Sequence, residues 1–220
     1  MNSPQMRLTI RQLARDLYVK GPPLALALQH YRPYISPFEL VVDAVPERSR
    51  VLDIGCGGGL VLGLLSKLRN TQGSIGIDSN RQAISLAQDM TERLTQGHGV
   101  VFEARDASTP LPSGPFDVVT LLDVMHHIAP AHQRLVLEQA IERVAPGGLF
   151  IYKDMVSKPL WRAHANRLHD LVIARQWIHY LPLAQAINWA EQKACVVLER
   201  STVNMLWYGH EIVVFKRMSA

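Results

Sequence analysis

The sequence predicts an α/β protein with a doubly wound, mostly parallel sheet. The main observation is that short apolar runs alternate with helix-like segments from about residue 50 onward. Such alternation is typical of strand–helix–strand units, whose successive strands lie parallel. The chain has 220 residues, of which 48% are hydrophobic. It is therefore long enough to bury a core without disulfides or a structural metal.

The N-terminal part, residues 1–48, is predicted to form a helical cap of the same domain. Apolar residues recur at roughly helical spacing over 5–18, and Gly21 with the two prolines after it ends that helix. A second short helix is expected over 24–30. Two further prolines interrupt the next stretch, and the second of them suits the first turn of a helix over 37–45.

The remaining residues, 49–220, are predicted to form the sheet and the helices that cover it. Five strands and a closing pair are expected, over 51–54, 74–77, 100–104, 116–122, 149–152, 195–203 and 211–216. The helices between them are expected over 60–69, 80–95, 131–144 and 183–191. Residues 154–182 are predicted to be a helical insertion after the fifth strand.

Composition excludes several classes of protein. The two cysteines, Cys56 and Cys195, form neither a disulfide framework nor a metal-binding pattern. No apolar run reaches the ~18 residues of a membrane span, and the first 17 residues do not resemble a signal peptide. The net charge of +4 comes from scattered basic residues, so it favours nucleic acid only slightly. We therefore expect a cytoplasmic protein.

A glycine-rich turn follows the first predicted strand, with the sequence Asp53-Ile54-Gly55-Cys56-Gly57-Gly58-Gly59. Glycine is needed where the backbone takes a positive φ or where a ligand touches the main chain. The dinucleotide fingerprint would require glycine at position 60, where the chain has Leu60, so the turn disfavours NAD. Taken alone, it is either a cofactor loop or a tight strand-to-helix turn.

This turn resembles the first motif of class I S-adenosylmethionine-dependent methyltransferases that act on small molecules. Four further segments resemble that family's motifs in the expected order, namely Gly76-Ile77-Asp78, Arg105-Asp106-Ala107, 122–128 and 144–149. The matching motifs span residues 50–153. The resemblance implies a seven-stranded Rossmann-like sheet, S-adenosylmethionine as the cofactor, and methyl transfer as the reaction.

The resemblance also implies a set of cofactor contacts. In that family a carboxylate after the second strand holds the ribose hydroxyls, and an acidic side chain with a backbone N–H after the third strand brackets the adenine. The residues placed at the cofactor in this way are Asp53, Gly55, Cys56, Gly57, Gly59, Asp78, Ser79, Asp106, Ala107, Leu122 and Asp123. In the family's arrangement Cys56 lies beside the methionine portion. It is expected to pack there rather than act as a nucleophile, because no base that could activate its thiol is evident.

Single residues of this set have other interpretations. Asp78 or Ser79 would also suit the N-cap of the helix expected near Asn80. Asp106 would also suit a turn. The occurrence of all these residues together favours the cofactor interpretation.

His126 and His127 follow the fourth predicted strand, where an acceptor would bind in this fold. One of them would act as a general base that removes a proton from a hydroxyl or amine. The alternative is that they cap or pack the following helix, and some acceptors need no base at all. We expect no metal on Asp123, His126 and His127, because adjacent histidines usually point apart and no fourth ligand is apparent.

Two segments are expected to cover the acceptor. One is the N-terminal cap, which carries Tyr18, Tyr31 and Tyr34. The other is the insertion at 154–182, in which apolar residues recur at helical spacing. Its aromatic and basic side chains suit an apolar or aromatic acceptor that carries negative charge, and the alternative is a solvated helix with a core stripe.

The sequence thus favours a methyltransferase that acts on a small apolar or aromatic acceptor. The basic residues Arg162, Arg167 and Arg175 suggest a second partner, an acidic carrier protein that presents the acceptor. A nucleic-acid methyltransferase is an alternative, although 122–126 departs from the motif of enzymes that methylate exocyclic amines of bases. A non-catalytic protein that binds S-adenosylmethionine is another. The methylated atom and the oligomeric state are not predicted.

Overall fold

A computed structural model describes residues 3–94, 99–156, 179–206 and 208–219 of the chain. It contains a seven-stranded sheet in the order β3-β2-β1-β4-β5-β7-β6. The strands are β1 Val51–Ile54, β2 Ile75–Asp78, β3 Val101–Ala104, β4 Phe116–Leu122, β5 Val144–Met155, β6 Cys195–Met205 and β7 Tyr208–Arg217. Strands β1 to β5 pair in parallel, whereas β7 runs antiparallel to both β5 and β6. The predicted fold class is confirmed.

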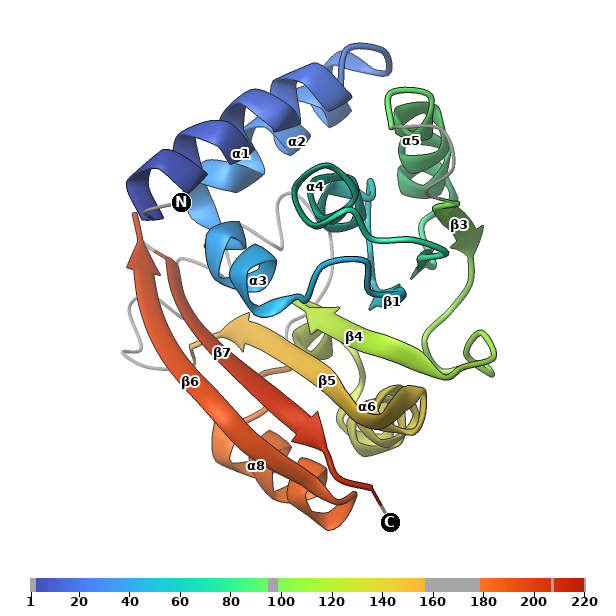
Figure 1. The fold of residues 1–220 in the computed structure, drawn as a ribbon, viewed down its shortest axis with the longest axis vertical. Coiled ribbons are helices and arrows are strands. Elements are labelled where there is room, and N and C mark those ends of the chain that lie inside the picture. The colour runs from blue at the N-terminus through green and yellow to red at the C-terminus, as the bar shows by residue number, and fades with distance from the viewer. Residues whose placement is uncertain (1–2, 95–98, 157–178, 207, 220) are drawn as a thin grey trace.

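Helices cover both faces of the sheet (Figure 1). They are α1 Ser3–Leu17, α2 Pro23–Ile35, α3 Phe38–Ala44, α4 Leu60–Arg69, α5 Arg81–Thr91, the short 3₁₀ helix η1 Met125–His127, α6 Pro130–Glu142 and α8 Leu183–Gln192. One apolar core joins α1, α3, α4 and α5 to the first face, and the other joins α6 and α8 to the second. Helix α2 lies beside α1.

Alternation along the strands separates these two cores. On β7, Ile212 and Val214 belong to the core under α1 to α5, whereas Val213 and Phe215 belong to the core under α6 and α8. Successive strand side chains point to opposite faces, so a sheet covered on both faces needs continuous apolar runs. This requirement explains why the central strands β1 and β4 are mostly apolar in the sequence, whereas the edge strand β6 is largely exposed and includes polar residues.

Several predicted boundaries are wrong: the helix predicted over 80–95 ends at Thr91, and the last strand begins at Tyr208 rather than at 211. Helix α2 does not end at residue 30 but continues through the buried Pro33 to Ile35. Strand β5 begins at Val144 rather than at 149, because Val144 pairs with Phe116 ahead of an irregularity in the register. The fifth strand also continues through 154 and 155, which were assigned to the insertion. The rest of that predicted helical insertion, 157–178, lies outside the described residues.

The start of α5 resolves one alternative from the sequence. Asn80 is the N-cap, and its side-chain oxygen accepts hydrogen bonds from the backbone N–H groups of Gln82 and Ala83. Neither Asp78 nor Ser79 fills that role. The carboxylate of Asp78 is therefore placed by other contacts, which belong to the site.

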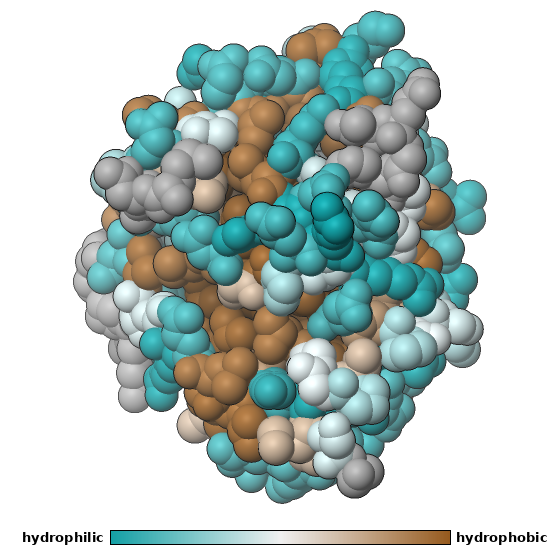
Figure 2. All heavy atoms as spheres, in the orientation of Figure 1, coloured by the Kyte–Doolittle hydropathy of each residue, from teal (hydrophilic) through white to brown (hydrophobic). Residues whose placement is uncertain are grey.

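The surface shown in Figure 2 carries an apolar band among polar side chains, in the region where Figure 1 draws β6 and β7. Strand β6 is an edge of the sheet, and its exposed large apolar residues are Val196, Val197 and Leu198. Among the described residues, none of the helices has the length and hydropathy required to cross a membrane.

Candidate functional site

A cleft of about 530 Å³ lies beyond the carboxyl ends of β1, β2, β3 and β4. Open α/β sheets bind their ligands at this edge, because the loops that follow parallel strands meet there. The cleft is lined by Arg32, Gly55, Gly57, Asp78, Ser79, Asn80, Arg105, Asp106, Ala107, Leu122, Asp123, Val124, His127 and Ile128.

The glycine-rich turn forms one wall of this cleft, and its glycines serve different purposes. Gly55, Gly57 and Gly59 all have positive φ angles. A Cβ added at Gly55 would lie 2.2 Å from Val124, and one at Gly59 would lie 2.6 Å from Phe102. These two glycines therefore allow close packing. At Gly57 the nearest atom would be Arg32 Nη1 at 3.4 Å, so this glycine leaves the main chain open toward the cleft.

The turn is held from outside by the N-terminal helices. The buried Tyr18 hydroxyl donates a hydrogen bond to the Gly58 carbonyl at 2.5 Å. A ring nitrogen of His30 lies 2.9 Å from the carbonyl of Tyr18, so α2 also contacts the residue that holds the turn. Burial raises the pKa of Tyr18 above its ordinary value, so the hydroxyl remains a donor. The N-terminal cap is thus joined to the wall of the cleft that the glycine-rich turn forms.

Asp53 lies at the base of the site and is only 1% exposed. Its Oδ1 accepts a hydrogen bond from Thr120 at 2.7 Å, but its buried Oδ2 has no partner among the described residues. Burial raises the pKa of Asp53 to about 7, although the Thr120 hydrogen bond and the nearby charge of Arg32 oppose that shift. A buried acceptor without a donor is costly, and a cationic ligand group would supply one.

Asp78 ties the second strand to the glycine-rich turn. Its Oδ2 accepts a hydrogen bond from the Gly57 N–H at 2.8 Å, and its Oδ1 accepts one from the Asn80 N–H at 2.8 Å. These bonds fix the carboxylate at the cleft wall. Each carboxylate oxygen can accept more than one hydrogen bond, so Asp78 retains capacity for a ligand's hydroxyl groups.

Asp106 is both a turn residue and a cleft residue. Its Oδ1 accepts hydrogen bonds from the Ser108 N–H at 2.8 Å and from the Ser108 hydroxyl at 2.7 Å. These two bonds lower the pKa of Asp106. The two interpretations left open by the sequence are therefore compatible, because the turn presents Asp106 and the next residue, Ala107, to the cleft.

Not all of the predicted cofactor residues reach the cleft. Eight of them line it, namely Gly55, Gly57, Asp78, Ser79, Asp106, Ala107, Leu122 and Asp123. Asp53, at the base of the site, and Cys56 and Gly59 are not among the lining residues. Burial, and then the nearby Asp53 and Asp78, raise the pKa of Cys56 well above its ordinary value. Its thiol therefore stays protonated and uncharged.

Asp123 closes the other end of the cleft in a left-handed conformation, with φ of 56°. Its Oδ2 pairs with Lys153, a side chain of β5 that is 2% exposed. Burial alone would raise the pKa of Asp123, but Lys153 and His210 bring it well below its ordinary value. Its Oδ1 is buried and has no partner among the described residues.

A second cavity, of about 220 Å³, adjoins the cleft and shares Arg32, Asp123 and His127 with it. The other residues that line this cavity are Ile35, Ser36, His126, Met155, Tyr208 and His210. Sequence reasoning missed Arg32 and His210. No spacing in the sequence pointed to them, because Arg32 comes from α2 and His210 comes from β7.

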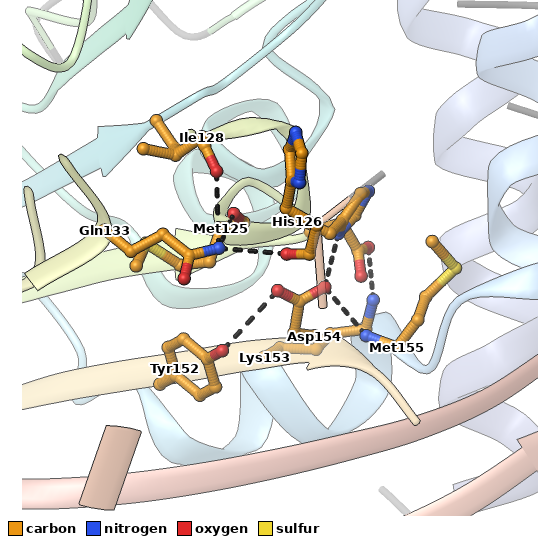
Figure 3. Close-up of polar contacts among 10 residues, drawn as sticks. Met125, His126, Ile128, Gln133, Tyr152, Lys153, Asp154 and Met155 are labelled. Atoms are coloured by element: carbon orange, nitrogen blue, oxygen red, sulfur yellow. Dashed lines mark hydrogen bonds and ion pairs between the residues drawn. The ribbon is translucent and has the colours of Figure 1, made fainter. Parts of the chain in front are cut away.

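His126 is buried and is oriented by Asp154 (Figure 3). Its Nδ1 contacts the Asp154 carboxylate, which also accepts a hydrogen bond from the Met155 N–H at 2.8 Å. The Tyr152 hydroxyl lies 3.5 Å from the same carboxylate. A carboxylate at Nδ1 favours the tautomer with the proton on that nitrogen, which makes Nε2 the basic nitrogen.

The turn that carries His126 is also fixed. The buried side chain of Gln133 donates to the carbonyl groups of Met125 and Ile128 (Figure 3). The rings of His126 and His127 have centroids only 4.1 Å apart, so the expectation that they point apart is wrong. Within the described ranges, no group of three or more His, Cys, Asp or Glu side chains is placed to hold a metal ion.

Comparison with known proteins gives the following matches. A family model described as "Methyltransferase domain" matches residues 28–199. A ubiquinone biosynthesis O-methyltransferase of Maricaulis maris is 36% identical over 107 residues, which cover 48% of this chain and 40% of that protein. A 27-O-demethylrifamycin SV methyltransferase of Amycolatopsis mediterranei is 32% identical over 111 residues, which cover 50% of this chain and 40% of that protein.

The match thus spans about two fifths of the length of these relatives. Among solved structures, a magnesium protoporphyrin IX methyltransferase from Synechocystis PCC 6803 with bound S-adenosylhomocysteine superposes with a TM-score of 0.68. It is 18% identical, and the match covers 98% of this chain and 97% of that chain. At this identity the likeness concerns the fold.

Proposed function

The chain belongs to the methyltransferase-domain family, whose members use S-adenosylmethionine, and from that premise we propose that it methylates a hydroxyl group of a small acceptor. The observation that carries the proposal is the pair of adjoining cavities. The larger one fits the cofactor, and the smaller one contains a histidine oriented by a carboxylate. Methyl transfer to a hydroxyl requires both.

The residues of the cleft fit the polar groups of S-adenosylmethionine. Asp53 Oδ2 is a buried acceptor without a donor, which suits the α-ammonium group. Arg32 lies beside Gly57 and suits the carboxylate. Asp78 would hold the ribose hydroxyls, while Asp106 and the Ala107 N–H would hold the adenine. This assignment uses four of the predicted cofactor residues, Asp53, Asp78, Asp106 and Ala107, and adds Arg32.

When bound, S-adenosylmethionine would supply a methyl group that is activated by its sulfonium and leaves behind a neutral thioether. The chain aligns the acceptor oxygen with that methyl group and excludes water. As the oxygen lone pair forms the new O–C bond, His126 Nε2 takes the hydroxyl proton. Asp154 would stabilise the imidazolium that forms on His126. His127, which lines both cavities, would position the acceptor rather than take the proton.

Two features support a hydroxyl over acceptors that need no base. A histidine oriented by a buried carboxylate is an arrangement that suits proton removal. The relatives described above are named as O-methyltransferases of ubiquinone biosynthesis and as a methyltransferase of 27-O-demethylrifamycin SV. The cavity volume of about 220 Å³ suits a single small ring or a head group of that size. The proposed carrier-protein contact at Arg162, Arg167 and Arg175 lies outside the described residues.

The proposal is tested in two stages. Calorimetric titration should show binding of S-adenosylmethionine and S-adenosylhomocysteine, with NAD as the negative control. Labelled methyl groups should then enter the small-molecule fraction of a cell extract. Incorporation into RNA would instead support the nucleic-acid alternative, and cofactor binding without incorporation would support a non-catalytic role. The exposed His132 on α6 provides a control variant. His132→Ala should keep both the binding of S-adenosylmethionine and the incorporation of labelled methyl groups.

A further inference from the structure

His210 lies in the smaller cavity, although it comes from β7 near the end of the chain. The residue is 3% exposed, and it pairs in the sheet with Met155. Its Nε2 lies 2.6 Å from the carbonyl oxygen of Ile35, at the end of α2. A carbonyl oxygen only accepts hydrogen bonds, so Nε2 carries a proton and donates it.

The other ring nitrogen, Nδ1, is then a lone-pair acceptor as long as the ring is neutral. Burial and the nearby charge of Lys153 lower the pKa of His210 to about 4, although Asp123 and the Ile35 carbonyl oppose the shift. The ring is therefore uncharged near neutral pH and is a poorer base than a histidine paired with a carboxylate. Nδ1 is fully enclosed and has no hydrogen-bond partner among the described residues.

A second buried acceptor borders the same cavity. Asp123 Oδ1 also has no partner among the described residues, since Lys153 pairs with Oδ2. Buried acceptors without donors are rare in native proteins and destabilise the state in which they remain unpaired. Both residues line this cavity, so a ligand that donates hydrogen bonds would match them.

We propose that His210 determines acceptor specificity: its Nδ1 accepts a hydrogen bond from a hydroxyl or N–H of the acceptor other than the group that is methylated. The inference rests on the proposed function, in which His126 serves the reacting hydroxyl. The acceptor is accordingly a small molecule or head group with at least two hydrogen-bond donors. An analogue that lacks the second donor leaves Nδ1 buried and unpaired, so it binds more weakly.

The test uses simple probes on the protein saturated with S-adenosylhomocysteine. Calorimetry compares phenol, which has one donor, with 1,2- and 1,3-dihydroxybenzene. At least one dihydroxybenzene should bind about tenfold more tightly than phenol. His210→Phe keeps an aromatic ring and should abolish this preference, whereas His132→Phe should keep it. Equal affinities in the wild type, or an unchanged preference in His210→Phe, would overturn the role of His210.

A measurement on the wild-type protein covers the case in which His210→Phe does not fold. Nitrogen NMR of the histidine side chains should show Nδ1 of His210 unprotonated and Nε2 protonated. Addition of the preferred dihydroxybenzene should shift the Nδ1 signal, and a protonated Nδ1 would refute the proposal. If S-adenosylhomocysteine itself does not bind, the proposed function fails. If it binds but the probes are not distinguished, only the role of His210 fails.

Discussion

The cofactor cleft and the smaller cavity are neighbours, yet they are built in different ways. Most of the cleft comes from turns that directly follow adjacent parallel strands. The cavity combines the end of α2, the η1 turn, the end of β5 and the start of β7. Short local motifs therefore specify the cleft, whereas only the complete fold assembles the cavity. Most residues of the cleft can be found in the sequence, as can His126 and His127 of the η1 turn, whereas Arg32 and His210 cannot.

The largest expected difference between the two regions follows from Gly57→Val. Gly57 has a φ of 53° and faces the cleft, so a β-branched side chain there adds strain and occupies cofactor space. Affinity for S-adenosylhomocysteine should fall by at least ~100-fold in calorimetry. Gly147 also has a positive φ, but a Cβ there meets nothing within 4 Å. Gly147→Val should therefore introduce similar backbone strain but keep the affinity for S-adenosylhomocysteine.

Variants of His126 and Asp154 in the smaller cavity should have the opposite effect: they should lower turnover and leave cofactor affinity unchanged. His126→Ala should lower kcat by roughly 10²–10⁴-fold while S-adenosylhomocysteine affinity stays unchanged, because the base acts only on the acceptor. Asp154→Asn should also lower kcat, since an amide does not stabilise the imidazolium that forms. If both variants keep full turnover with the true acceptor, no base is used. The assignment of proton removal to the smaller cavity would then be wrong.

Asp78→Ala should produce an intermediate effect, confined to the cleft. The loss of charged hydrogen bonds to the ribose costs about 1.5–3 kcal/mol, which corresponds to roughly a 10- to 150-fold weaker affinity. The exposed Asp89 on the neighbouring helix α5 provides the control, and Asp89→Ala should bind like the wild type. Equal affinities in the two variants would remove Asp78 from the cofactor site.

The smallest effect is a pH dependence of cofactor binding. The pKa of Asp53 is raised to about 7, and the α-ammonium group binds to the ionised carboxylate. Protonation of Asp53 below that pH competes with binding, so affinity should rise about fivefold from pH 6 to pH 7, where α-amino groups remain mostly protonated. Calorimetry on Asp53→Asn should show weaker binding with a flat profile. A wild-type profile that falls with increasing pH would contradict this role.

The same contrast explains what the sequence predicted. The alternation of strands with helices and the helix over residues 60–69 follow from periodicity, which is a local property. Eight of the predicted cofactor residues line the cleft because they sit in local turns. The continuation of α2 past Pro33 depends on tertiary packing, and propensity alone does not reveal it. Arg32 and His210 reach the site through the fold, 178 positions apart in the chain.

The hydrogen bond from Tyr18 to Gly58 connects the N-terminal helices to the glycine-rich turn, which lies 40 residues further along the chain. Helices α1 and α2 precede every strand, yet they hold the glycine-rich turn and supply Arg32 to it. Docking of these helices and occupancy of the cleft are therefore thermodynamically coupled. Each should favour the other, so that ligand slows local opening of the first 36 residues. Protease resistance and hydrogen exchange of α1 would report on the cofactor, even though no residue of α1 lines the cleft.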